Sequence, residues 1–141
     1  MKPIDYLKAL GTAAAVLVLN LALTTALITV YGTLIEPGRP QSHYRDMAPQ
    51  IGAWSGPAGG AILMFAAGLL LARRRHAARN VMAFMTATVA FYVALDLSLG
   101  LATAPAADVL TWSFAVSLGL MAAAGFVGAV VGGRRPARGE A

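Results

Sequence analysis

The hydrophobic positions of the chain fall into four long blocks rather than at the intervals of a soluble helix or strand. Apart from Asp96, these blocks carry no charge, and they cover residues 9–35, 47–72, 80–107 and 109–133. Each block exceeds the ~20 residues that a helix needs to cross about 30 Å of hydrocarbon. The pattern therefore predicts an all-α integral membrane protein with four transmembrane helices in an antiparallel bundle.

Charges, prolines and glycines indicate where the four helices should begin and end. The segment EPGRP after residue 35 contains two prolines and a glycine, which stop a helix. Asp46 and Asp108 suit the N-caps of the second and fourth helices, and Pro57 should kink the second helix. The predicted helices cover about residues 6–34, 47–72, 78–102 and 108–132. The single transmembrane domain, 1–141, also contains an outer loop at 35–46, an arginine loop at 73–79 and a short basic tail at 133–141.

Basic residues lie at alternate ends of the uncharged blocks. Lys2 and Lys8 precede the first block, arginines separate the second from the third, and further arginines follow the fourth. This distribution predicts a multi-pass protein of a bacterial-type inner (plasma) membrane, with the N-terminus and the C-terminus cytoplasmic. The arginines of the second connection, which should also contact anionic lipid headgroups, are Arg73, Arg74, Arg75 and Arg79. Because topology accounts for the net charge of +5, we expect no nucleic-acid partner.

The composition also limits the chemistry that the chain can perform. It contains no cysteine, which excludes disulfides, thiolate metal sites and thiol redox chemistry. No phosphate-binding glycine loop, nucleophile elbow or zinc-protease motif is present, so we expect no cofactor. Glu36, His43 and Asp46 match no compact ligand spacing, and we therefore predict no metal site. An enzyme is the less favoured class.

Glycines recur at four-residue intervals on two of the predicted helices. Small residues at this spacing let helix backbones approach closely in lipid, where little hydrophobic force acts between helices. The predicted helix-packing residues are Gly52, Gly56 and Gly60 on the second helix and Gly128 and Gly132 on the fourth. Packing within the bundle is the favoured interpretation, and the interface of a homodimer or of a larger membrane complex is the alternative.

Asp96 is the charged residue inside an otherwise uncharged block, and polar residues of other helices fall near its depth. It follows Arg79 by 17 residues, or about 25 Å of helix, which puts it in the outer part of the bilayer. A carboxylate there costs on the order of 2–4 kcal/mol unless it is neutralised or paired. The polar residues on the same face or at a similar depth are Asn20, Thr24, Tyr92, Ser113 and Ser117.

These residues predict a small pocket, open to the outer face, in which Asp96 binds a cation, a proton or a polar ligand group. The five polar residues just named would be its partners. Arg45 or His43 from the outer loop would gate or complete the pocket. The alternative is a structural tie, in which Asp96 is protonated, or hydrogen-bonded to Ser113 or Thr24, and only holds helices together.

Three functions remain open at this point. The leading hypothesis is a small inner-membrane protein that binds a small solute or ion through the outer-facing pocket, and in its stronger form translocates it in exchange for a proton on Asp96. The second is a non-catalytic accessory subunit that packs on a larger membrane complex through its glycine faces. The third is a membrane enzyme acting on an apolar substrate, with Asp96 and Tyr92, or His43 and Glu36, as its acid–base pair.

Overall fold

The computed structural model describes residues 2–74 and 78–133, which form helices joined by short connections. Four of these helices are long and apolar enough to cross a membrane, as in a multi-pass membrane protein. In chain order the elements are α1 (Pro3–Val30), the π-helical turn η1 (Tyr31–Ile35), α2 (Gln41–Arg74), α3 (Ala78–Thr103), the short α4 (Ala106–Val109) and α5 (Trp112–Gly133).

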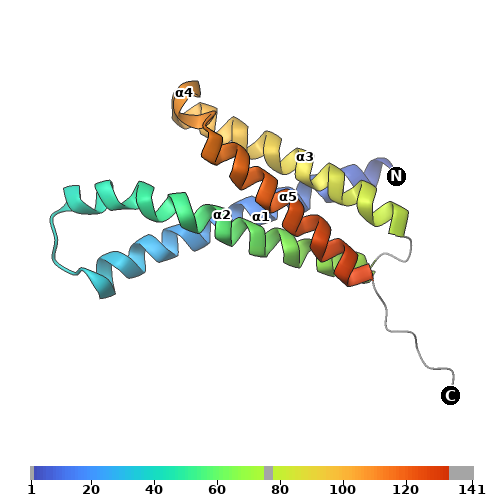
Figure 1. Ribbon diagram of the computed structural model, residues 1–141, viewed down its shortest axis with the longest axis horizontal. Coiled ribbons are helices and arrows are strands. Elements are labelled where there is room, and N and C mark those ends of the chain that lie inside the picture. The colour runs from blue at the N-terminus through green and yellow to red at the C-terminus, as the bar shows by residue number, and fades with distance from the viewer. Residues whose placement is uncertain (1, 75–77, 134–141) are drawn as a thin grey trace, which may run out of the picture.

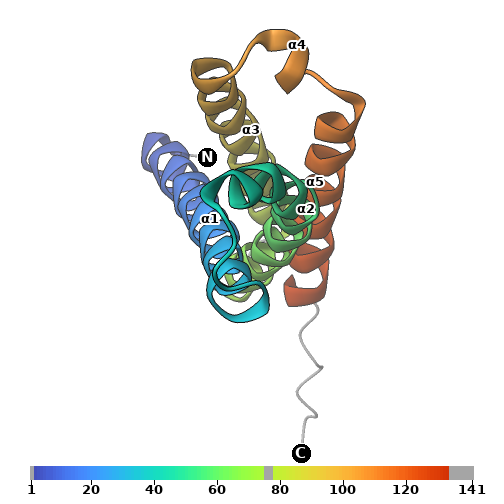
Figure 2. The same ribbon diagram turned by 90° about the vertical axis from the view of Figure 1, so that its left-hand side faces the viewer.

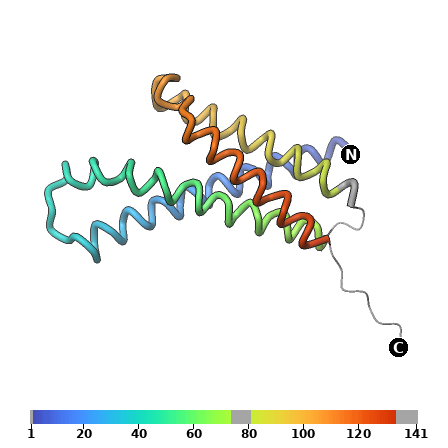
Figure 3. The backbone as a smooth tube through the Cα atoms, viewed as in Figure 1, coloured from blue at the N-terminus to red at the C-terminus, as the bar shows by residue number. Residues whose placement is uncertain are grey.

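The long helices differ in length, and they lie obliquely to one another. At 1.5 Å per residue, α1 with η1 is about 50 Å long, as is α2, whereas α5 is about 33 Å long. The turn between α1 and α2 extends at the left of Figure 1 well beyond α5. The first residues of α1 and α3 and the last residues of α2 and α5 lie at the opposite end (Figures 1 and 3). Seen from that turn, α4 bridges the ends of α3 and α5 (Figure 2).

The connection between α1 and α2 is shorter than the predicted outer loop. It spans residues 36–40, because α2 begins at Gln41, six residues before the predicted start at Met47. Asp46 therefore lies inside α2 and is not its N-cap. The run QSHYRD is polar, which suggested a loop, but it contains no helix-breaking residue. The helix passes through both Pro49 and Pro57.

The last long helix also begins elsewhere than predicted. Asp108 belongs to the short helix α4, which ends at Val109, and α5 starts at Trp112. The hydroxyl oxygen Oγ1 of Thr111 accepts a hydrogen bond of 3.3 Å from the backbone N–H of Phe114. Thr111 therefore makes the N-cap contact that the sequence assigned to Asp108.

The closest helix packing is between α2 and α5, and it depends on glycine. A Cβ atom on Gly128 would overlap the carbonyl oxygen of Phe65, and one on Gly132 would overlap that of Leu69. Gly68 of α2 meets the backbone of Gly125 in the same way, although the sequence analysis named neither residue. These contacts let the two backbones touch without intervening side chains, which is how helices associate in lipid.

Candidate functional site

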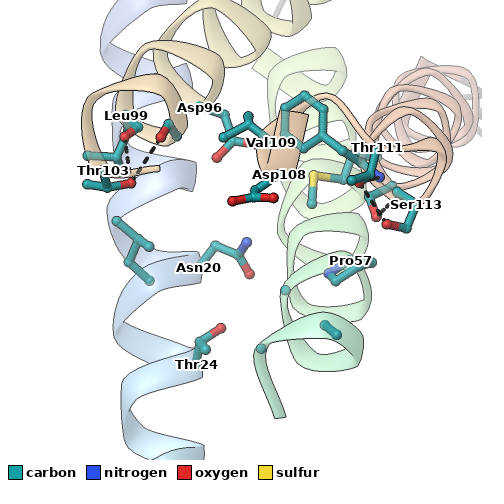
Figure 4. A pocket seen from close by; sticks show the side chains of 18 of the residues that line it. Asn20, Thr24, Pro57, Asp96, Leu99, Thr103, Asp108, Val109, Thr111 and Ser113 are labelled. Atoms are coloured by element: carbon teal, nitrogen blue, oxygen red, sulfur yellow. Dashed lines mark hydrogen bonds between the residues drawn. The ribbon is translucent and has the colours of Figure 1, made fainter. Parts of the chain in front are cut away.

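A cavity of about 480 Å³ lies among α1, α2, α3 and α5, with α4 at its rim (Figure 4). Its rim includes Thr103 and the α4–α5 connection, so it lies towards the end of the protein opposite Arg73. The six helix-borne residues that the sequence suggests for a pocket all line it: Asn20, Thr24, Tyr92, Asp96, Ser113 and Ser117.

The wall formed by α1 contains a buried amide with an unsatisfied acceptor. Asn20 is 8% exposed, and its side chain projects from α1 towards the cavity (Figure 4). Within the described part of the chain, its Oδ1 atom has no hydrogen-bond partner. One turn further, Thr24 Oγ1 accepts a hydrogen bond of 3.4 Å from Ser55 Oγ of α2. Ser55 is almost fully buried, and sequence reasoning missed it because serine is common on membrane helices.

The wall formed by α3 presents a tyrosine and a carboxylate one helical turn apart. Tyr92 is 1% exposed, whereas Asp96 is half-buried at the cavity surface. Over residues 2–74 and 78–133, the Asp96 carboxylate accepts no hydrogen bond and forms no ion pair. In particular, no hydrogen bond joins it to Ser113 or to Thr24 in the described part of the chain.

The α4 and α5 side adds a second carboxylate and three hydroxyls. Asp108 lines the cavity from α4, and Figure 4 shows its side chain directed towards the same space as Asp96 and Asn20. The hydroxyls of Thr111 and Ser113 lie 2.9 Å apart, and Ser117 Oγ donates a hydrogen bond of 2.7 Å to the carbonyl oxygen of Ser113. The position of Asp108 before an apolar block predicts only a helix cap, so its place in the cavity lining could not be expected from the sequence.

Some of the predicted packing glycines of α2 line the cavity, whereas another packs against a neighbouring helix. Gly52 and Gly56 line the cavity, and among the described residues no atom lies within 4 Å of a Cβ built on Gly56. Gly60 instead approaches Met121 of α5 and the amide of Asn20. Of the series proposed for helix packing on α2, only Gly60 therefore lies tightly against another helix.

His43 and Arg45, the predicted gate, do not line the cavity. His43 Nε2 lies 2.7 Å from Glu36 Oε2, and its ring stacks on Tyr31 with the centroids 6.4 Å apart. Arg45 is exposed on α2. Both residues lie near the turn of the α1–α2 hairpin, because α2 is already helical there instead of forming a loop that could fold back over the site.

Tyr44 completes this cluster at the hairpin turn. Its hydroxyl donates a hydrogen bond of 2.6 Å to the carbonyl oxygen of Glu36 and accepts one of 3.1 Å from the backbone N–H of Arg39. Gly38 has φ +80°, a conformation that favours glycine, and it allows the sharp turn between α1 and α2. No group of three histidine, aspartate or glutamate side chains able to hold a metal ion occurs in the described part of the chain.

The arginines expected at lipid headgroups lie at the other end of the protein. Arg73 and Arg74 end α2, Arg79 is in the first turn of α3, and Arg75 lies outside the described residues.

Comparisons of the chain with protein-family models, curated proteins and solved structures found no match. A function is therefore inferred from the cavity itself.

Proposed function

We propose that the protein is a multi-pass protein of a bacterial-type inner membrane that binds a small solute or ion in the cavity lined by Asp96. In this proposal the four long helices form an antiparallel bundle, both termini face the cytoplasm, and the cavity opens to the outer face. The basic residues support this orientation, because Arg73 and Arg79 lie at the end opposite the cavity, and short arginine-rich connections favour the cytoplasm.

One observation carries the proposal: an unpaired carboxylate at the surface of a cavity inside a membrane-spanning region. The described residues give Asp96 neither a hydrogen bond nor a basic partner. A charged residue at membrane depth costs a few kcal/mol, and such residues commonly mark binding sites and ion pathways. A carboxylate that ties helices together would be bonded to a neighbouring helix, and this one faces the cavity instead.

The accessory-subunit and enzyme hypotheses receive less support. An accessory subunit would present its glycine faces to a partner, but Gly128 and Gly132 already lie against the backbone of α2. An acid–base pair of His43 and Glu36 would act outside the cavity, at the hairpin turn. Asp96 and Tyr92 do line the cavity, but solute binding also places them there. Their position therefore does not favour an enzyme over a binding protein.

Cysteine accessibility tests whether water and solutes reach the site. The natural chain has no cysteine, so single substitutions give a clean background. Ser117→Cys should react with a membrane-impermeant cationic methanethiosulfonate added to the outer side of oriented vesicles, and not with reagent confined to the inner side. Val116→Cys is the matched control, because Val116 is one residue earlier on α5, 51% exposed and outside the cavity lining.

The control should remain unreacted in lipid, since its side chain faces the acyl chains. If Ser117→Cys is equally unreactive from both sides, yet labels fully after denaturation, no outer-facing aqueous pocket exists and the proposed function is wrong.

A further inference from the structure

The charged groups that line the cavity have one sign. They are Asp96 and Asp108, and the described residues that line the cavity include no lysine, arginine or histidine. Carboxylates next to low-dielectric helix walls concentrate cations and repel anions. The electrostatics of the cavity therefore select a positively charged ligand.

The unsatisfied polar atom of the cavity is also a hydrogen-bond acceptor. Asn20 Oδ1 is buried and without a partner in the part of the chain that the structure describes, and Figure 4 shows the side chain directed into the cavity. Buried polar atoms in proteins nearly always have partners. An acceptor in this position can accept a hydrogen bond from an N–H or O–H group of a ligand.

Two glycines of α2, Gly59 and Gly60, leave space for the Asn20 amide. A Cβ atom on Gly59 would lie 2.8 Å from Asn20 Oδ1, and one on Gly60 would lie 3.3 Å from its nitrogen. Larger residues at these positions of α2 would push the side chain away. The two glycines therefore leave the space that the Asn20 amide occupies.

The lining of the cavity suits an organic cation better than a metal ion held by several acidic or histidine ligands. The described residues contain no three-carboxylate or histidine group that could hold a metal. The cavity has apolar walls from Leu99, Val109 and Phe114, which suit a hydrocarbon body. Its volume of about 480 Å³ is within the range of small-molecule sites.

We propose that the ligand is a small organic ammonium ion, whose N–H groups donate to Asn20 Oδ1 and whose charge is balanced by Asp96. Asp108 attracts the cation at the rim, and the apolar walls contact its alkyl or aryl group. This inference rests on the proposed function, because it specifies the solute that the cavity binds. A primary or secondary amine satisfies both requirements, whereas a quaternary ammonium lacks the N–H donor.

Protection of Ser117→Cys from labelling tests the ligand class with defined probes. Butylammonium, butanol and butyrate have similar size and differ in charge. We expect butylammonium at saturation to slow labelling of Ser117→Cys at least tenfold, and butanol and butyrate to leave the rate nearly unchanged. Tetramethylammonium should protect less than butylammonium, since it cannot donate to Asn20.

Second substitutions in the Ser117→Cys chain assign the contacts. Asp96→Asn removes the countercharge and Asn20→Leu removes the acceptor, and each should raise the butylammonium concentration for half-protection about tenfold or more. Asn20→Asp keeps an acceptor oxygen in place and should retain protection. This variant distinguishes loss of a contact from damage to the fold.

The outcomes separate this inference from the proposed function. Equal protection by butanol or butyrate, or labelling that no probe slows, would overturn the ammonium assignment while leaving an accessible pocket. Unchanged butylammonium protection in both Asp96→Asn and Asn20→Leu would also overturn it. Failure of Ser117→Cys to react at all would overturn the pocket itself.

Discussion

The side-chain oxygen of Asn20 lies beside Gly59 so closely that a Cβ atom on that glycine would be 2.8 Å from it. Asn20 of α1 and Gly59 of α2 are therefore in contact beside the cavity. The position of the Asn20 amide depends on the absence of a side chain at residue 59. Asn20 is buried, and its side-chain oxygen has no partner among the described residues.

Gly59→Ala should therefore displace the Asn20 amide and weaken ligand binding. We expect the butylammonium concentration for half-protection to rise about tenfold, with only a small loss of stability, because the added methyl group would meet the movable ends of the Leu23 and Asn20 side chains. Gly11→Ala is the matched control, because Gly11 lies outside the cavity lining and a Cβ there meets no described atom within 4 Å. Labelling kinetics and thermal unfolding in nanodiscs would measure both effects, and equal behaviour of the two variants would contradict the prediction.

Gly128→Ala should loosen the contact between α2 and α5. The added methyl group would collide with the carbonyl oxygen of Phe65, which belongs to rigid helix backbone and cannot move aside. We expect destabilisation of roughly 1–3 kcal/mol, measured by the midpoint of unfolding in detergent. Gly119→Ala, on the same helix with nothing described within 4 Å, should be neutral or slightly stabilising. A neutral Gly128→Ala would mean that the helices are further apart.

Thr111→Ala should fray the start of α5. It removes the hydroxyl that accepts from the Phe114 N–H, which is worth about 1 kcal/mol at an N-cap. Amide hydrogen exchange in the first turn of α5 should accelerate roughly fivefold. Asp108→Asn should leave that exchange unchanged, since Asp108 lies in α4. Faster exchange in Asp108→Asn and unchanged exchange in Thr111→Ala would instead identify Asp108 as the N-cap of α5.

Asp108→Asn should instead change the charge preference of the cavity. In the Ser117→Cys chain, a cationic methanethiosulfonate should react faster than an anionic one of similar size. Removing one carboxylate at the rim should lower this rate ratio by about two- to fivefold at low salt, and less at high salt. A ratio insensitive to Asp108 would indicate that reagents enter without passing the α4 rim.

The number of membrane-spanning helices could be predicted because it depends on local sequence. Each uncharged block is long enough to span hydrocarbon, whatever it packs against. The depth of polar residues could also be counted from helix ends, so residues as distant as Asn20 and Ser117 were expected near Asp96, and both line its cavity. The depth of a residue in the membrane depends only on its position along its helix, and that position can be counted in the sequence.

The helix starts and the pairing of helices could not be predicted in the same way. The polar run that begins α2 suits both a solvated loop and a helix that continues beyond the membrane, and only the contacts of Tyr44 with Glu36 distinguish them. Gly68 and Gly125 meet because α2 and α5 are neighbours, which is a tertiary fact. The same holds for His43, whose partner is Glu36 rather than the cavity.

The unequal lengths of the helices have a consequence for the lipid around them. The uncharged stretch of α1 and η1, residues 9–35, is about 40 Å long, which favours tilting in about 30 Å of hydrocarbon, whereas α5 at about 33 Å can stand nearly upright. Thicker bilayers bring α1 upright and thinner ones tilt it further. Since α1 contributes Asn20 and α5 contributes Ser117, a change in the tilt of α1 would move one wall of the cavity relative to the other.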